Sequence, residues 1–171
     1  MMRLVMLLMA TVMLAGAAAA YFWHEAEAKS AEAEYQAAQA GLEQMIQQVK
    51  YRAALGEGDV NGRGWPLTID KNWFNGTPPR NTLLSGRHPW VQIAGPAEYD
   101  LDHPPARVAL DENSPEGAGF WYNPGKGIVR ARVGPMMSDK RAIDLYNRLN
   151  GTSVDRLFAP VPHPVVSEGD E

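Results

Sequence analysis

The sequence predicts an α+β fold in which one long N-terminal helix packs on a small antiparallel β-sheet. Residues 4–23 carry no charge, and helix-forming composition then continues with no proline before Pro66. Beyond residue 90, short runs of β-branched and aromatic residues alternate with Gly, Pro and Asn, which is typical of strands joined by turns. We therefore expect four parts: a transmembrane anchor (1–23), a soluble continuation of the helix (24–55), a small α+β head (56–154) and a disordered tail (155–171).

The first segment has the length and composition of a transmembrane helix. At about 1.5 Å per residue, a helix of about 20 residues spans the hydrocarbon core of a bilayer. Arg3 precedes the apolar run and Glu25 follows it, so the positive-inside rule places the N-terminus in the cytoplasm. We expect a single-pass protein of a bacterial inner membrane, with the lipid bilayer as a partner and the head periplasmic or extracellular. The residues expected to anchor it and to pack with other helices are Leu4, Leu7, Leu8, Val12 and Leu14.

A cleaved signal peptide is the alternative interpretation of the same segment. Residues 1–3 form a short basic region, residues 4–14 an apolar region, and residues 18–20 a small-residue cleavage site. Cleavage there would leave an exported soluble periplasmic binding domain. The helix-forming composition runs through this site without a break, which favours the uncleaved anchor.

Residues 24–55 predict one soluble helix, because they are rich in the helix formers Ala, Glu, Gln and Lys. Its second half has an apolar stripe at three- and four-residue spacing, and Gly56 follows as a stop signal. A sheet of a few short strands needs a cover for its apolar face. The residues expected to dock the head on the helix are Leu42, Met45, Ile46 and Val49.

The head begins with glycine-rich turns and an irregular segment, and strand signals follow. We expect strands at 90–94, 106–110, 119–122 and 128–133, the last two joined as a hairpin. Alternation in the last strand predicts one solvated face, carrying Arg130 and Arg132. Ser138 or Asp139 is expected to cap a final helix of about eleven residues, which Asn150 and Gly151 end.

The composition argues against several classes of function. A formal net charge of −4 is unsuited to nucleic acid, and the absence of cysteine excludes disulfides and thiol catalysis. Residues 59–70 have part of the spacing of a calcium loop, but Arg63 stands where an oxygen ligand is required. Asp100, Asp102 and His103 have side chains that can bind metal ions, but we interpret this stretch, which leads into Pro104 and Pro105, as a solvated loop. We find no nucleophile–base pair or carboxylate pair, and expect no enzyme and no catalytic, cofactor-binding or metal-binding residue.

This layout resembles the type IV pilin and type II secretion pseudopilin superfamily. The resemblance covers residues 4–133 and rests on architecture more than on a strict motif. It is carried by the apolar runs 4–9 and 12–15 with Tyr21-Phe22, by the segments 65–67, 73–74 and 78–79, and by the Phe-Trp-Tyr-Asn hairpin at 120–123. In that superfamily the N-terminal helix is both membrane anchor and filament core. The resemblance implies a membrane-anchored structural subunit of a cell-envelope secretion or pilus-type assembly, with other pilin-like subunits or secretion-machine proteins as partners.

One motif of the superfamily is missing. Its members carry a prepilin peptidase site of the type Gly-Phe-Thr-Leu-Ile-Glu before the apolar run, whereas this chain has Met1-Met2-Arg3. Two explanations are open. Either the true start codon lies upstream, or the chain is a divergent member that does not polymerise by the usual route.

Overall fold

The computed structural model describes the backbone of residues 2–56, 58–84, 87–105, 108–111 and 117–157. Within the N-terminal helix, solvent exposure is described for Met13, for Gly16 and for every residue from Ala18 onward. The chain forms two compact units, Met1–Gln36 and Ala37–Glu171.

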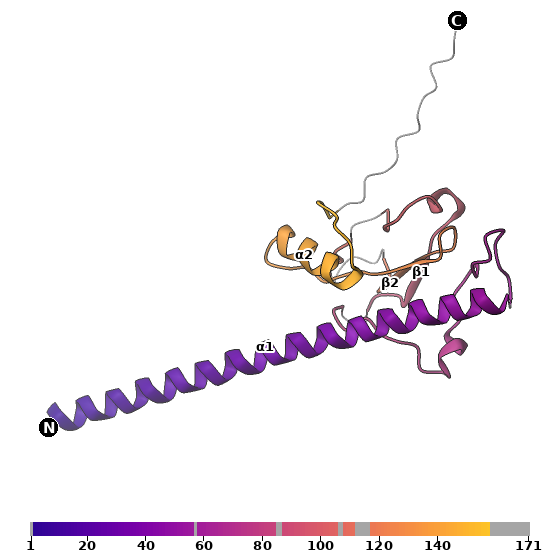
Figure 1. Cartoon of the computed structure of the whole chain (residues 1–171). Coiled ribbons are helices and arrows are strands. Elements are labelled where there is room, and N and C mark those ends of the chain that lie inside the picture. Colours follow the sequence, from indigo (N-terminus) through magenta and orange to yellow (C-terminus); the bar gives the residue numbers. More distant parts are fainter. Residues whose placement is uncertain (1, 57, 85–86, 106–107, 112–116, 158–171) are drawn as a thin grey trace, which may run out of the picture. The chain divides into compact units, whose positions relative to one another are not determined.

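The long N-terminal helix, α1 (Met2–Leu55), confirms the helical part of the predicted α+β fold (Figure 1). No proline interrupts it. Gly56 ends it in a left-handed conformation (φ +63°), and the Gly56 N–H donates to the carbonyl of Arg52 at 3.1 Å. This is the glycine stop that the sequence predicts.

The predicted membrane span and the single-pass inner-membrane localisation are wrong. Among the residues that the structure describes, no helix offers a stretch that is both long and apolar enough to cross a bilayer. The physical reason lies in α1 from Ala18 onward, where alanines supply little apolar surface and the ionisable Glu25, Glu27 and Lys29 soon follow the aromatic residues. The side chains of the predicted anchor residues lie outside the described residues; these are Leu4, Leu7, Leu8, Val12 and Leu14.

The head contains a three-stranded sheet in the order β1 (Val91–Ile93), β2 (Phe120–Asn123) and β3 (Ile128–Ala131). The β2–β3 hairpin is antiparallel, as predicted, but β1 runs parallel to β2. The predicted antiparallel sheet is therefore wrong, and the sheet is mixed. A parallel pair needs a crossover connection of about a dozen residues or more, which the segment 94–119 supplies.

The expected strand at 106–110 does not form in its described part. Residues 106 and 107 lie outside the described residues, and Ala109 makes an isolated parallel bridge with Val133. The Val108 N–H donates to the carbonyl of Leu157 at 2.9 Å, and Leu157 is buried. The expected disordered tail beyond residue 157 lies outside the described residues.

Both faces of the sheet are covered (Figure 1), so the predicted solvated face is wrong at Arg132, which is buried, whereas Arg130 is half-exposed. Helix α2 (Asp139–Asn150) packs on one side and buries Tyr146 and Leu149. The second half of α1 covers the other side. Asn150 also closes the outer edge of β3, because its side chain accepts from the N–H of Ala131 and donates to the Ala131 carbonyl, both at 2.8 Å. The core lies between the sheet and these two helices. It is centred on β2, all of whose residues are buried.

Candidate functional site

The second half of α1 carries a buried face that we call the head seam, formed by Ala38, Leu42, Met45 and Val49. Met45 and Val49 are fully buried and Leu42 is 4% exposed, while the predicted docking residue Ile46 is half-exposed. Burying side chains of this size removes about 1.5–3 kcal/mol of unfavourable hydration each. The head seam therefore fixes the head on this part of the helix.

Gly41 lets the head approach the helix backbone closely. A Cβ atom at this position would lie 3.0 Å from the Arg80 carbonyl oxygen and 3.7 Å from Cζ of Phe120. The sequence analysis did not single out this contact. A signal was present, because Gly41 is the one glycine between Gly16 and Gly56, in a segment where glycine weakens a helix.

The glycine-rich turns at 59–66 hold the tip of the β2–β3 hairpin. The Asn61 amide donates to the Pro124 carbonyl at 2.6 Å, and the Arg63 guanidinium donates to the Gly125 carbonyl at 2.7 Å. The Tyr122 hydroxyl donates to the Pro66 carbonyl at 2.7 Å, and burial raises the pKa of this phenol. The segment with part of a calcium-loop spacing is thus a clamp, in which side chains bind neighbouring backbone.

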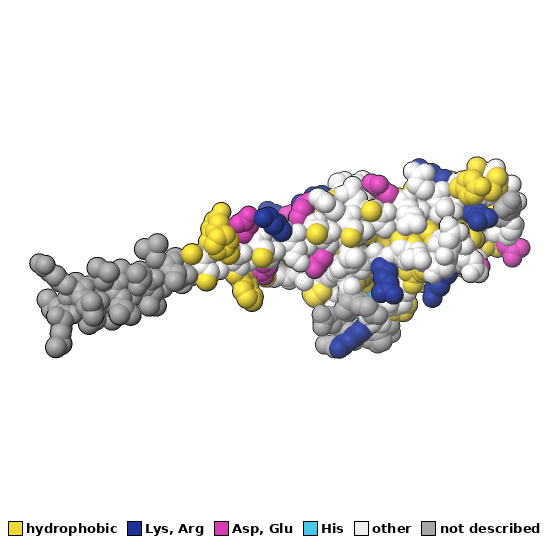
Figure 2. Space-filling view, turned by 90° about the horizontal axis from the view of Figure 1, so that it is seen from below, with side chains coloured by type: hydrophobic (Ala, Val, Ile, Leu, Met, Phe, Trp, Pro, Cys, Tyr) yellow, Lys and Arg dark blue, Asp and Glu magenta, His cyan; other side chains and the backbone are white. Residues whose placement is uncertain are grey.

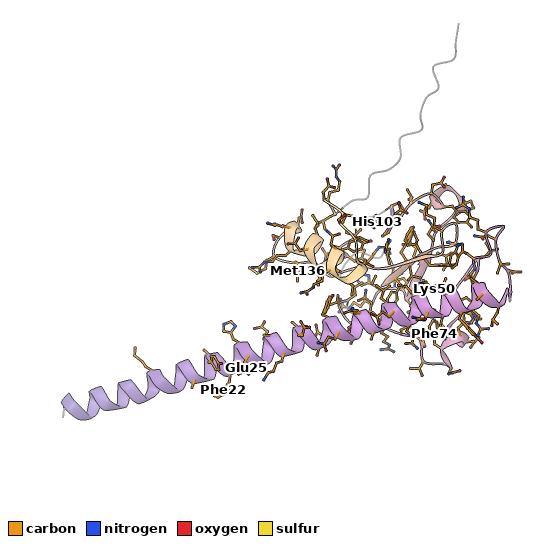
Figure 3. The ribbon with its side chains drawn as sticks, in the orientation of Figure 1. Phe22, Glu25, Lys50, Phe74, His103 and Met136 are labelled. Atoms are coloured by element: carbon orange, nitrogen blue, oxygen red, sulfur yellow. The ribbon has the colours of Figure 1, made fainter. Side chains whose placement is uncertain are left out.

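Residues 18–34, which we call the exposed stretch of α1, contrast with the head seam. Every side chain in it is exposed; Tyr21 is 65%, Phe22 67% and Trp23 76% exposed. The rings of Tyr21 and Phe22 meet edge to face with centroids 5.9 Å apart. Figure 2 shows hydrophobic side chains on opposite sides of this stretch with acidic ones beside them, and Figure 3 marks Phe22 and Glu25 on it. The described part of the chain therefore leaves these three aromatic side chains largely in water.

The polar loop that contains Asp102 and His103 is a structural cluster. Lys126 forms a 2.8 Å ion pair with Asp102, and this hydrogen bond lowers the pKa of the Asp102 carboxyl. His103 Nδ1 lies 3.0 Å from the Tyr146 hydroxyl, and burial and then Arg130 lower the pKa of His103. These side chains bind one another, and the described residues contain no group of three potential metal ligands.

Arg132 is a buried cation that the sequence analysis placed in solvent. Its guanidinium donates to the Ala118 carbonyl at 3.1 Å and to Gln92 Oε1 at 2.8 Å. Nε finds no hydrogen-bond partner among the described residues. Burial lowers the pKa of Arg132 to about 10, so the group keeps its charge at neutral pH.

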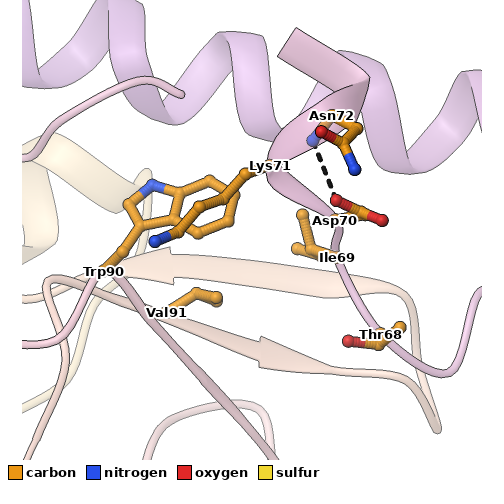
Figure 4. A pocket seen from close by; sticks show the side chains of 7 residues that line it. All are labelled: Thr68, Ile69, Asp70, Lys71, Asn72, Trp90 and Val91. Atoms are coloured by element: carbon orange, nitrogen blue, oxygen red, sulfur yellow. Dashed lines mark hydrogen bonds between the residues drawn. The ribbon is translucent and has the colours of Figure 1, made fainter. Parts of the chain in front are cut away.

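A cleft of about 610 Å³ lies beside β1 (Figure 4). It is lined by residues 68–72 and by Trp90 and Val91. The Lys71 ammonium stands 5.9 Å from the Trp90 ring centroid, a cation–π distance, and Asp70 accepts from the Asn72 N–H at 2.8 Å. The cleft thus combines an aromatic surface with amine, carboxylate and amide groups.

Comparison of the chain with protein-family models, curated proteins and solved structures finds no match.

Proposed function

We propose that this chain is a non-enzymatic, pilin-like structural subunit of a secretion or pilus-type assembly. Its head is docked on the second half of α1, and the exposed stretch joins it to other components of the assembly. The observation that carries the proposal is the exposed Tyr21-Phe22-Trp23 cluster on a helix, because exposed aromatic side chains that lie close together are typical of contact sites with another molecule.

The fold supports the same assignment. A helix of 54 residues is far longer than is needed to cover a three-stranded sheet. Among the described side chains of α1, the buried ones begin at Ala38. The remaining stretch keeps its helical backbone through propensity and side-chain pairs such as Glu25–Lys29 at 2.8 Å. A rigid rod with an apolar patch is suited to helix–helix assembly.

Site-specific photo-crosslinking in the source cells tests the proposal. A photoreactive phenylalanine analogue placed at Phe22 is expected to form discrete covalent adducts with assembly components. The matched control carries the analogue at Met137, which is 94% exposed on the head, and is expected to give far fewer adducts. If the chain accumulates in cells and Phe22 gives no adduct above the Met137 control, the proposal is wrong.

A second candidate is an exported binding domain, and the cleft beside β1 favours it. A volume of about 610 Å³ lies within the range of small-molecule sites. In this case the mature protein lacks about the first twenty residues, as cleavage at a small-residue site requires. The intact mass of the natural protein separates the two candidates, because cleavage after residue 20 would leave Tyr21-Phe22-Trp23 at the fraying end of the helix, whereas the structural subunit keeps these residues inside an intact helix.

A further inference from the structure

We infer that the exposed stretch of α1 receives a helix of a different protein whose flanks carry Lys and Arg, in preference to a second copy of this chain. The inference rests on the proposed function and names the kind of partner. It is carried by the spacing of apolar and acidic residues around the helix.

The apolar residues of the exposed stretch continue the register of the head seam. Tyr21, Ala28 and Tyr35 follow one another at seven-residue intervals, and the same spacing leads on to Leu42 and Val49. Ala31 lies between Ala28 and Tyr35 at the three- and four-residue spacing that keeps side chains on one helix face. We call the face formed by Tyr21, Ala28, Ala31 and Tyr35 the upstream seam.

The upstream seam fits a helix as its occupant. Tyr21, Ala28 and Ala31 are exposed and Tyr35 is half-exposed. Alanine side chains allow two helix axes to approach to the short end of the usual separation of about 8–10 Å. Tyr21, 65% exposed, would bury its ring against such a partner.

Acidic residues border the upstream seam on both sides. At about 100° per residue, Glu25 and Glu32 fall along one border and Glu27 and Glu34 along the other. Within the exposed stretch these four glutamates stand beside one lysine, Lys29, which pairs with Glu25 at 2.8 Å. Glu32 accepts from the Gln36 amide at 3.1 Å, an uncharged donor that leaves its charge uncompensated.

The charge pattern argues against a second copy in either orientation. In a parallel pair of identical helices, the two different borders meet, and in an antiparallel pair each border meets itself. Because both borders are Glu, carboxylates face carboxylates in both cases, which repel. A partner helix with Lys or Arg at the same positions replaces each repulsion by an ion pair, and this difference sets specificity.

Mixing the native full-length chain with its charge-reversed variant E25K/E27K/E32K/E34K tests the inference. The chain has no cysteine, so S153C supplies a single site for a dye on an exposed residue of the head. Sedimentation of the labelled native chain then measures its affinity for unlabelled native and for unlabelled variant chains. We expect the mixed pair to be at least about tenfold tighter than the native pair at low salt. That excess should shrink at about 0.5 M salt.

A second reversal provides the matched control. D59K/D100K/D144K/D155K makes the same change in net charge on exposed residues of the head. We expect the native chain to bind this variant no more tightly than it binds a second native chain. An equal preference for both reversals would show non-specific attraction and overturn the inference. Native pairs as tight as mixed pairs would overturn it in favour of a second copy.

Two further measurements keep these results interpretable. Near-UV circular dichroism should give all variants the same melting transition as the native head, because none of the eight positions is buried. A photoreactive residue at Ala28, on the upstream seam, separates the two proposals. Adducts formed there only with this chain's own copies would contradict the basic-partner inference and leave the structural-subunit function standing, whereas an absence of adducts at both Ala28 and Phe22 would remove both.

Discussion

The two halves of α1 have similar helix propensity but differ in what stabilises them. The head seam places Met45 and Val49 in full burial, whereas the exposed stretch leaves Tyr21, Phe22 and Trp23 mostly in water. Packing supplies most of the stability of helices in proteins, and isolated helices are marginal. The comparison teaches that packing in this chain's own core stabilises the second half, whereas the described side chains of residues 18–34 remain exposed.

Introducing a charge into each half of α1 should give the largest difference in stability between the two halves. Met45→Asp places an unpaired carboxylate at a fully buried site and should cost more than about 4 kcal/mol, enough to unfold the head. Ala28→Asp, at an exposed site, should cost only about 0.5–0.7 kcal/mol of helix propensity. Urea unfolding followed by near-UV circular dichroism measures the first effect, and far-UV helicity measures the second. A native midpoint for Met45→Asp would contradict the head seam.

Replacing glycine by alanine in each half should sharpen the comparison, because the change should destabilise the head at one position and leave its stability unchanged at the other. Gly41→Ala brings a Cβ to 3.0 Å from the Arg80 carbonyl, and we expect a net loss of about 1–2 kcal/mol of head stability despite better propensity. At Gly16 nothing lies within 4 Å of the added Cβ, so Gly16→Ala should leave the unfolding midpoint of the head unchanged and raise helicity. If the two variants give equal midpoints, the helix and the segment around Arg80 do not press together as described.

The parts of the fold that follow from local sequence could be predicted, and the parts that depend on distant contacts could not. The β2–β3 hairpin follows from the turn residues Asn-Pro-Gly, and α2 follows from its Ser138 cap and Gly151 stop. The parallel pairing of β1 depends on a partner almost thirty positions away, as Val91 lies opposite Phe120.

The same division applies to the candidate site. The spacing of the head seam is a helical pattern that is visible in the sequence, and so is the run Tyr21-Phe22-Trp23. The contact of Gly41 with the Arg80 carbonyl and the burial of Arg132 are not visible, because both depend on which distant segment covers the position. Continued one residue past the end of β3, the alternation places Arg132 opposite to the buried Val129 and Ala131, but α2 covers that face as well.

Lowering the pH should weaken the head. The pKa of His103 is lowered by burial first and by Arg130 second, with Asp102 opposing, so the unfolded chain binds a proton more readily than the head does. Stability is therefore complete above the ordinary pKa of 6.5 and decreases as the pH falls below it. Urea midpoints at pH 7.5 and 5.5 should show this decrease in the native chain and a smaller one in His103→Gln. An identical decrease in the variant would assign the effect to other groups.

Truncating the aromatic cluster should have the smallest effect on stability and the largest on assembly. Because Tyr21, Phe22 and Trp23 are at least 65% exposed, Y21A/F22A/W23A should change the unfolding midpoint of the head by less than about 0.5 kcal/mol. In cells, the same variant should lose adducts to a photoreactive residue placed at Ala28, on the upstream seam. A head that is destabilised by this triple substitution would mean that the cluster packs within its own chain. In that case the first half of α1 would already have its partner, and the contrast between the two halves of the helix would disappear.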